Sequence, residues 1–236
     1  MWGMVDGAPP HVRRGLVALL VPVIAMTLAT GCGSASDPSP PSGVDGLVIP
    51  TPSIDPDDFV EEVDNRWLPL PPGSRRTYRV SGEQSGTAVA EVSERTWPVS
   101  GVDATVLVTT FEDRRTADFY AQDLAGNVWW LGRDGVWQAG VDGAEAGLAM
   151  AAHPRVGDGF ASSGSDGEVE DLAVVRSVDA SVTVPAGSYR DCVQIETHSP
   201  LDPGVRELWT YAAGVGLVQA DSLEGSDLLF ELVEEP

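Results

Sequence analysis

Strand-length runs of β-branched and aromatic residues follow one another from Ser74 onward, separated by Gly, Asp and Asn. Such runs favour strands, and the residues between them form tight turns. No amphipathic segment of helix length separates the runs, so a parallel sheet with crossover helices is excluded. The runs are residues 77–80, 88–92, 104–109, 117–121, 128–131, 174–178, 192–195, 208–211 and 217–220.

The sequence therefore predicts a mainly β fold, a single curved antiparallel sheet or open half barrel of roughly ten strands. A short N-terminal helix is expected to precede it, with Asp55 as N-cap and Pro56 at the first helical position. Residues 140–157 read as a long irregular lid or covering loop. Residues 55–236 are enough for one β domain with a sizeable core.

The N-terminal segment is typical of a lipoprotein signal peptide. Arg13 and Arg14 precede an apolar run, residues 16–29, which ends in small residues before Cys32. The alternative is a transmembrane anchor, but the run is shorter than the roughly 20 apolar residues that a span needs, and it contains a proline. We therefore predict cleavage after residue 31 and lipidation of Cys32.

The residues after Cys32 form a Ser/Pro-rich stretch with few apolar side chains. Such composition cannot bury enough surface to offset ordering, so residues 32–54 are predicted to be a tether. The three segments 1–31, 32–54 and 55–236 place the β domain on the extracytoplasmic face of the cell membrane, attached through the acyl chains on Cys32.

The charge of the chain limits its partners. All 14 basic residues are Arg, against 36 Asp and Glu, which gives a formal net charge of −22. Phosphate backbones and anionic headgroups are bound largely through Lys and Arg, so we expect no nucleic-acid partner and no basic membrane-binding face. Cations, basic proteins and neutral ligands in an apolar pocket remain compatible with this charge. The sequence makes no prediction of oligomeric state.

Only Cys192 remains unpaired if Cys32 carries lipid. We expect Cys192 to be buried as a small hydrophobic residue. Two alternatives stay open: a reactive thiol, or a disulfide with Cys32 if that residue is not lipidated.

No constellation of catalytic or metal-ligating residues stands out. His153 and His198 are the only histidines after the predicted cleavage site, and neither belongs to a recognisable hydrolase or zinc motif. Asp and Gly cluster at residues 123–127, 133–135 and 165–168, but this pattern favours hairpin turns over calcium loops. We therefore predict no enzymatic activity, no metal and no cofactor.

Aromatic residues are the remaining candidates for a binding site. Trp129 and Trp130 are adjacent on one predicted strand, so their side chains point to opposite faces. Together with Trp209 and Tyr211, they are the candidates for lining an apolar ligand pocket. The alternative is that all four belong to the core.

Several segments resemble a group of uncharacterised secreted and lipid-anchored actinobacterial proteins. Residues 65–73 (NRWLPLPPG) resemble the N-terminal element NPYFPLxPG of that group, and residues 119–130 resemble its WYAQDxxGNVWY hairpin. Residues 184–192 and 211–218 resemble its closing pair, VPAGxxxDC and YYAPGVGLV. Arg66 and Ala213 stand where Pro is usual. The resemblance covers most of residues 57–233 and implies an exported β protein without assigning a site.

These features lead to two hypotheses. In the first, a curved sheet encloses an apolar ligand against the aromatic side chains, so that the protein is a non-catalytic binder or carrier. In the second, the domain is a surface protein-interaction module with a solid core. A cavity of several hundred Å³ would favour the first hypothesis, and a filled interior the second.

Overall fold

The structure is a computed structural model that describes residues 54–165, 168–199 and 204–234. The predicted signal peptide, Cys32 and the tether up to residue 53 lie outside these residues. No helix of the length and hydropathy needed to cross a bilayer occurs in the described part of the chain.

The described residues form sixteen strands and one 3-10 turn. The strands on the N-terminal side are β1 (Phe59–Val60), β2 (Arg75–Gly82), β3 (Gly86–Val92), β4 (Trp97–Val99), β5 (Val102–Phe111), β6 (Arg114–Asp123), β7 (Val128–Arg133), β8 (Trp137–Gln138), β9 (Ala144–Glu145) and β10 (Gly147–Met150). The remaining strands are β11 (Gly159–Ser165), β12 (Glu168–Val184), β13 (Gly187–His198), β14 (Arg206–Ala212), β15 (Gly216–Glu224) and β16 (Leu228–Glu234).

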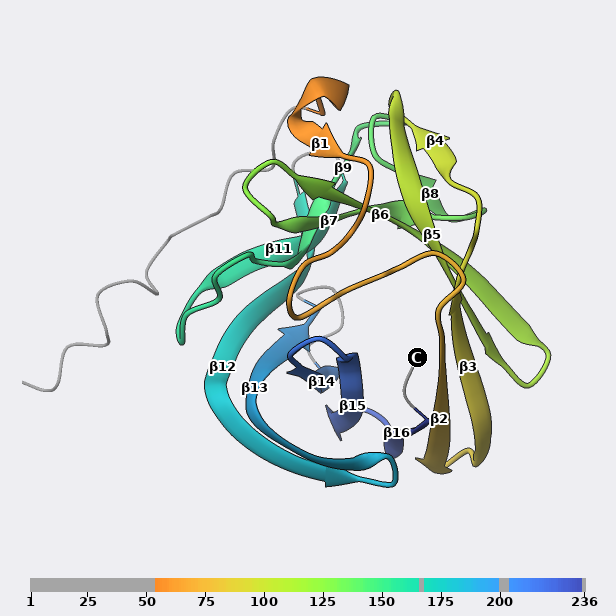
Figure 1. The fold of residues 1–236 in the computed structure, drawn as a ribbon, viewed down its shortest axis with the longest axis vertical. Helices are drawn as coiled ribbons and strands as arrows, with labels where there is room; N and C mark the ends of the chain where they lie inside the picture. Colours follow the sequence, from red (N-terminus) through yellow and green to blue (C-terminus); the bar gives the residue numbers. More distant parts are fainter. Residues whose placement is uncertain (1–53, 166–167, 200–203, 235–236) are drawn as a thin grey trace, which may run out of the picture. The chain divides into compact units, whose positions relative to one another are not determined.

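All of the strands belong to one antiparallel sheet, in the order β10-β7-β6-β5-β3-β2-β16-β15-β14-β13-β12-β11-β9, with β1, β4 and β8 paired alongside. Two meanders, β2 to β10 and β11 to β16, meet where β2 pairs with β16. The sheet curves strongly, and the segment between β1 and β2 runs across the space that the strands surround (Figure 1). This confirms a mainly β fold with one curved, open antiparallel sheet.

The two edges of the sheet are formed by consecutive pieces of chain. β10 pairs with β7 at one edge, β9 pairs with β11 at the other, and only Ala146 lies between β9 and β10. The prediction that residues 140–157 form a long irregular lid was therefore wrong in part. Six of these eighteen residues, in β9 and β10, belong to the edges of the curved sheet, because they pair with β11 and β7, and the other twelve are irregular.

The predicted strand count and helix also need correction. The nine runs predicted from the sequence all lie inside observed strands, but the sheet has sixteen strands and not ten. Instead of a helix there is a single 3-10 turn, Pro56–Asp58, capped by the Asp55 carboxylate, which accepts a hydrogen bond from the Asp57 backbone N–H. The turn ends at Phe59 because β1 pairs with β6 at that point.

Two apolar clusters make up the core. The larger cluster packs Trp67 and Leu70, from the segment that crosses the sheet, with Trp129, Met150 and Phe160. The smaller cluster contains Tyr78, Val80, Cys192, Val218 and Leu232. The core is thus divided between two groups of side chains, and an interior cavity borders both.

Candidate functional site

The curved sheet surrounds a partly open cavity of about 530 Å³. Strands from both meanders line it, because alternate residues of each strand point toward the enclosed space. Its aliphatic and phenylalanine lining consists of Leu68, Leu70, Ala88, Ala90, Leu107, Leu148, Ala149, Phe160, Ala173, Ile195, Val205, Leu217, Ala220, Leu228 and Phe230. This volume lies within the range of small-molecule binding sites.

One wall of the cavity is the N-terminal strap, residues 61–74, which contributes Leu68 and Leu70. Asn65 fixes the bend of the strap, since its side-chain oxygen accepts hydrogen bonds from the backbone N–H groups of Trp67, at 2.8 Å, and Leu68, at 3.1 Å. The strap is also held by the β14–β15 turn, where the Gly214 N–H donates to the carbonyl oxygen of Arg66 at 2.7 Å. The NRWLPLPPG segment therefore builds part of the cavity wall.

Three of the four predicted aromatic residues line this cavity. Trp130, Trp209 and Tyr211 face it from β7 and β14, whereas Trp129 lies in the larger core cluster, 4% exposed, and does not line it. Trp130 also makes an edge contact with Trp137, with ring centroids 5.0 Å apart.

The position of Trp129 is explained by the hairpin between β6 and β7. The carboxylate of Asp123 accepts hydrogen bonds from the backbone N–H groups of Ala125 and Asn127, the Asn127 amide and the indole of Trp129, all at 2.8–2.9 Å. Gly126 takes a φ of +89° in this turn. Residues 123–127 thus form the predicted hairpin turn, and the carboxylate oxygens of Asp123 are used within it.

A charged pair borders the cavity beside Trp130. Asp118 is 5% exposed and accepts two hydrogen bonds from Arg133, at 2.8 and 3.2 Å, and one from the Trp130 indole at 3.1 Å. The guanidinium of Arg133 also lies over the Trp130 ring, 5.3 Å from its centroid. Because the pair is bidentate, its charge is neutralised within the wall.

Arg76 and Tyr78 alternate on β2 and line the cavity on another side. Arg76 is 3% exposed, and it donates to the carbonyl oxygens of Val215, at 2.8 Å, and Pro69, at 2.7 Å. The Tyr78 hydroxyl donates to the Leu217 carbonyl oxygen at 3.0 Å. Burial raises the pKa of Tyr78 well above its ordinary range. The Arg76 side chain joins the strap to the β14–β15 turn.

Tyr120 and Tyr211 supply two further hydroxyl groups. Both line the cavity, and neither hydroxyl has a hydrogen-bond partner among the described residues. Burial is the main cause that raises the pKa of each, and their mutual proximity adds to the rise for Tyr120. Both hydroxyls are therefore protonated donors at neutral pH.

Cys192 lies apart from the cavity lining. It is 0% exposed, within the smaller core cluster, at a place where the pairing of β12 with β13 shifts register. The preceding residue, Asp191, has a φ of +54°. Burial raises the pKa of the Cys192 thiol, with a further contribution from Asp191. The structure supports the buried-hydrophobe interpretation over a reactive thiol.

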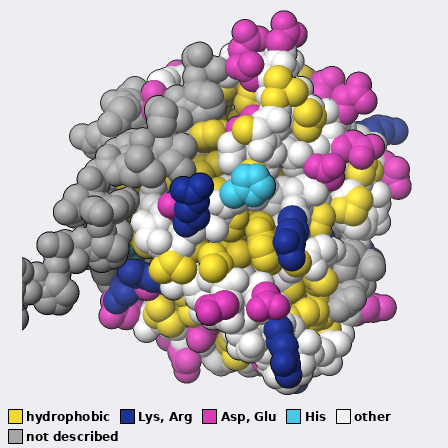
Figure 2. Space-filling view, turned by 60° about the vertical axis from the view of Figure 1, so that its left-hand side comes forward, with side chains coloured by type: hydrophobic (Ala, Val, Ile, Leu, Met, Phe, Trp, Pro, Cys, Tyr) yellow, Lys and Arg dark blue, Asp and Glu magenta, His cyan; other side chains and the backbone are white. Residues whose placement is uncertain are grey.

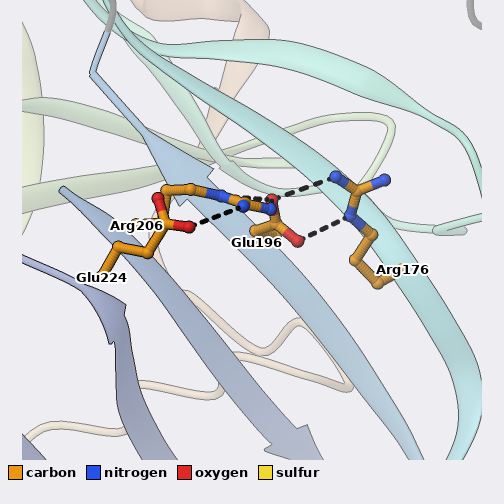
Figure 3. Close-up of polar contacts among 4 residues, drawn as sticks. All are labelled: Arg176, Glu196, Arg206 and Glu224. Atoms are coloured by element: carbon orange, nitrogen blue, oxygen red, sulfur yellow. Dashed lines mark hydrogen bonds and ion pairs between the residues drawn. The ribbon is translucent and has the colours of Figure 1, made fainter. Parts of the chain in front are cut away.

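A row of charged side chains crosses the sheet on the face opposite to the cavity-lining residues Ile195 and Thr197. Glu196 receives two hydrogen bonds from Arg176, at 2.9 and 3.0 Å, and is also paired with Arg206, which reaches Glu224 at 3.4 Å (Figure 3). Hydrogen bonds from Arg176 are the largest cause that lowers the pKa of Glu196 to about 2.

The molecular surface is mixed in character. On the face shown in Figure 2, acidic and arginine side chains are interspersed with apolar ones around a histidine, and no broad basic area appears. Such a face does not provide the clustered positive charge that nucleic-acid binding needs. His198 borders the cavity, whereas His153 is exposed outside it. Within the described ranges, no three His, Cys, Asp or Glu side chains converge as metal ligands.

The polar residues of the cavity were not found from the sequence. The sequence places Tyr78 and Asp118 only within predicted strands and makes no prediction for Arg76, although all three line the cavity. The available signal was alternation: Arg76, Tyr78 and Val80 share one face of β2 and are all buried. Arginine is rarely buried unless polar groups contact it, so a buried arginine among alternating apolar residues indicates polar contacts on that face of the strand.

Comparisons with known proteins give only a loose likeness of fold. No family model matches the chain, and no curated protein matches it. A protein from Bacteroides fragilis described as exported, with a YmcC-like fold, is 12% identical with a TM-score of 0.45, covering 73% of this chain and 99% of its own. A protein from Parabacteroides distasonis described as a lipoprotein is 15% identical with a TM-score of 0.36, covering 72% and 97%. At these scores neither likeness carries an argument about function.

Proposed function

We propose that this protein is a lipid-anchored extracytoplasmic protein that binds an apolar ligand inside its curved sheet. The observation that supports the proposal is the cavity of about 530 Å³, whose lining is predominantly aliphatic and aromatic. An apolar ligand would gain free energy by leaving water for such a site, at about 25 cal/mol for each Å² of apolar surface buried. A protein-interaction module that binds partners at its surface would not require an interior cavity.

The anchor and location rest on the sequence. The predicted signal peptide ends at residue 31, directly before Cys32, and about twenty Ser/Pro-rich residues separate Cys32 from the β domain. This arrangement holds the cavity near the membrane surface, where apolar ligands are available. The resemblance of residues 65–73 and 119–130 to lipid-anchored actinobacterial proteins supports the same location.

The test uses the purified full chain and a neutral fluorescent probe, 1-N-phenylnaphthylamine, whose emission rises in apolar surroundings. Thr109 lines the cavity on β5, while its neighbour Thr110 is exposed and does not line it. Thr109→Trp places an indole in the cavity, and Thr110→Trp places the same side chain in solvent. We expect Thr109→Trp to weaken probe binding at least tenfold and Thr110→Trp to leave it unchanged.

Native mass spectrometry of the protein purified from its own envelope complements this comparison, because it detects a ligand that remains bound. Equal probe affinity in both variants, with circular dichroism showing that both are folded, would place probe binding outside the cavity. That result, or the absence of any probe binding to the wild-type protein, would overturn the proposal in favour of the interaction module.

A further inference from the structure

Arg76 is a buried cation with no buried anion beside it. The residue is 3% exposed, and no carboxylate of the described residues lies within ion-pair distance of it. Its two observed acceptors are the backbone carbonyl oxygens of Pro69 and Val215. A guanidinium has five N–H donors and stays charged, so two carbonyl oxygens satisfy neither its charge nor its hydrogen-bonding capacity.

Tyr211 adds a second donor without an acceptor to the same cavity. It is 8% exposed, and its hydroxyl makes no hydrogen bond to any described residue. Tyr78 lies close enough to both Arg76 and Tyr211 for electrostatic interaction with each. Because Tyr211 lines the cavity, an acceptor oxygen of a bound molecule could take the hydrogen bond of this hydroxyl.

We propose that the apolar ligand carries an acidic head group, a carboxylate or phosphate, which Arg76 and Tyr211 bind inside the cavity. This inference rests on the proposed function and specifies its ligand class. The head group would supply the acceptor oxygens and the negative charge that this wall lacks. The aliphatic lining would take the hydrocarbon portion.

The rest of the cavity allows a negative charge at this position despite the net charge of the chain. The carboxylate of Asp118, the most buried acid of the lining, is already paired with the guanidinium of Arg133. Arg76 is only 3% exposed, and charge interactions are stronger at such a buried position than at the surface. Two further acids line the cavity: Glu207, which accepts a hydrogen bond from the Trp209 indole at 3.1 Å, and Asp221. The pairing with Arg76 has to outweigh repulsion from these two carboxylates as well as from acids on the exposed surface, which solvent and salt screen.

The first test compares three ligands of equal chain length with the wild-type protein: a long-chain carboxylic acid, its primary alcohol and its methyl ester. Each displaces 1-N-phenylnaphthylamine, with ligand concentrations kept below micelle formation. We expect the acid to bind at least tenfold more tightly than the alcohol or the ester, because a charged acceptor strengthens the hydrogen bonds of the site. This comparison needs no variant of Arg76, whose removal would also loosen the strap.

The second test uses Tyr211→Phe, which removes a hydroxyl that makes no hydrogen bond within the described structure. The variant should unfold at the same or a higher temperature than the wild type, while the ratio of its affinity for the acid to its affinity for the alcohol falls about tenfold. Tyr189→Phe is the matched control, because Tyr189 is the one tyrosine that does not line the cavity. Its acid affinity should stay unchanged.

The outcomes separate this inference from the proposed function. Equal affinities for the acid, alcohol and ester would leave the apolar cavity in place and overturn the acidic head group. An unchanged ratio of acid to alcohol affinity in Tyr211→Phe would overturn the role of that hydroxyl. Failure of every ligand and of the neutral probe to bind would instead remove the proposed function itself.

Discussion

The side-chain amide of Asn65 donates a hydrogen bond of 2.8 Å to the carbonyl oxygen of Gly126, joining the strap to the β6–β7 hairpin across 61 residues of sequence. The same amide group lies 3.4 Å from the carbonyl oxygen of Ala151. Since the side-chain oxygen of Asn65 also caps the strap, every polar atom of this side chain is used. Residues 65–73 and residues 119–130, the two segments that stood out in the sequence, therefore contact each other.

Asn65→Asp should destabilise the fold strongly. The substitution replaces a two-hydrogen donor with a carboxylate oxygen that would face the carbonyl oxygens of Gly126 and Ala151 in a buried place. We expect the free energy of unfolding to fall by about 2–4 kcal/mol in urea titration. Gln84→Glu makes the same chemical change at an exposed position and should alter stability little. A stable Asn65→Asp protein would show that the strap does not depend on this amide.

Acid should weaken the protein through Glu196. Its pKa in the folded state is lowered to about 2, first by hydrogen bonds from Arg176, so folding favours the ionised form. This contribution to stability is complete above about pH 4.5 and is lost as the pH falls toward 2. The measurement is the unfolding midpoint between pH 5 and pH 2, where Glu196→Gln should flatten the decline.

Glu224→Gln serves as the comparison for Glu196, because Glu224 is 53% exposed and reaches Arg206 only at 3.4 Å. Its pH profile should follow that of the wild type. If both variants titrate alike, then the buried Glu196 carboxylate is not the group that responds to acid.

Cys192→Ser should lower the free energy of unfolding by about 1–2 kcal/mol, because a hydroxyl would replace the thiol in a fully buried apolar position. Cys192→Ala should cost a similar amount or less. In a Cys32→Ala background, a thiol reagent should modify native Cys192 far more slowly than the denatured chain. Labelling at the same rate in both states would reject burial.

The β14–β15 turn offers a comparison between two glycines with positive φ. Gly214 has φ +76° and open space where a Cβ would lie, whereas a Cβ on Gly216, at φ +96°, would approach Arg76 Nη2 to 3.2 Å. Gly214→Ala should cost about 1 kcal/mol of stability and leave ligand affinity unchanged. Gly216→Ala should cost more and also weaken binding of a long-chain acid. Equal effects of the two variants would contradict a close approach to Arg76.

If residues 32–54 are the tether that the sequence predicts, Cys32→Ala should release the protein from membranes without unfolding the β domain, because the predicted lipid site lies outside that domain. Membrane fractionation with acyl-chain labelling measures this, and circular dichroism checks the fold. A Cys32→Ala protein that stays with the membrane would mean that residues 16–31 are the anchor.

The strands that could be predicted are those whose composition favours extended chain without help from neighbours, such as residues 104–109 in β5. β4, β8 and β9 contain two or three residues each and are strands only because a longer strand pairs with them. β16 was missed for another reason. Its sequence LLFELVE spaces apolar residues in a way that is compatible with a helix as well as a strand.

The aromatic part of the candidate site could be predicted, whereas its polar part could not. Large aromatic residues such as Trp209 mark a buried surface by their composition alone. The Arg76 guanidinium donates hydrogen bonds to the carbonyl oxygens of Pro69 and Val215, and only the tertiary structure brings these two carbonyl groups next to it. Alternation along β2 places Arg76 on the buried face, but only the tertiary structure shows that it is a cation without an anionic partner.

The pairing of β2 with β16 sets the order in which this chain can fold. Arg79 and Glu231, which face each other across that ladder, are 152 residues apart, and β16 leaves the ribosome after all of the other described strands. Each meander can form early from local contacts. The pairing of β2 with β16 must follow, and contacts between residues so far apart in the sequence slow folding. Until β16 emerges, the backbone of β2 facing it has no partner, so during biosynthesis this edge is the place most exposed to mispairing and capture by chaperones.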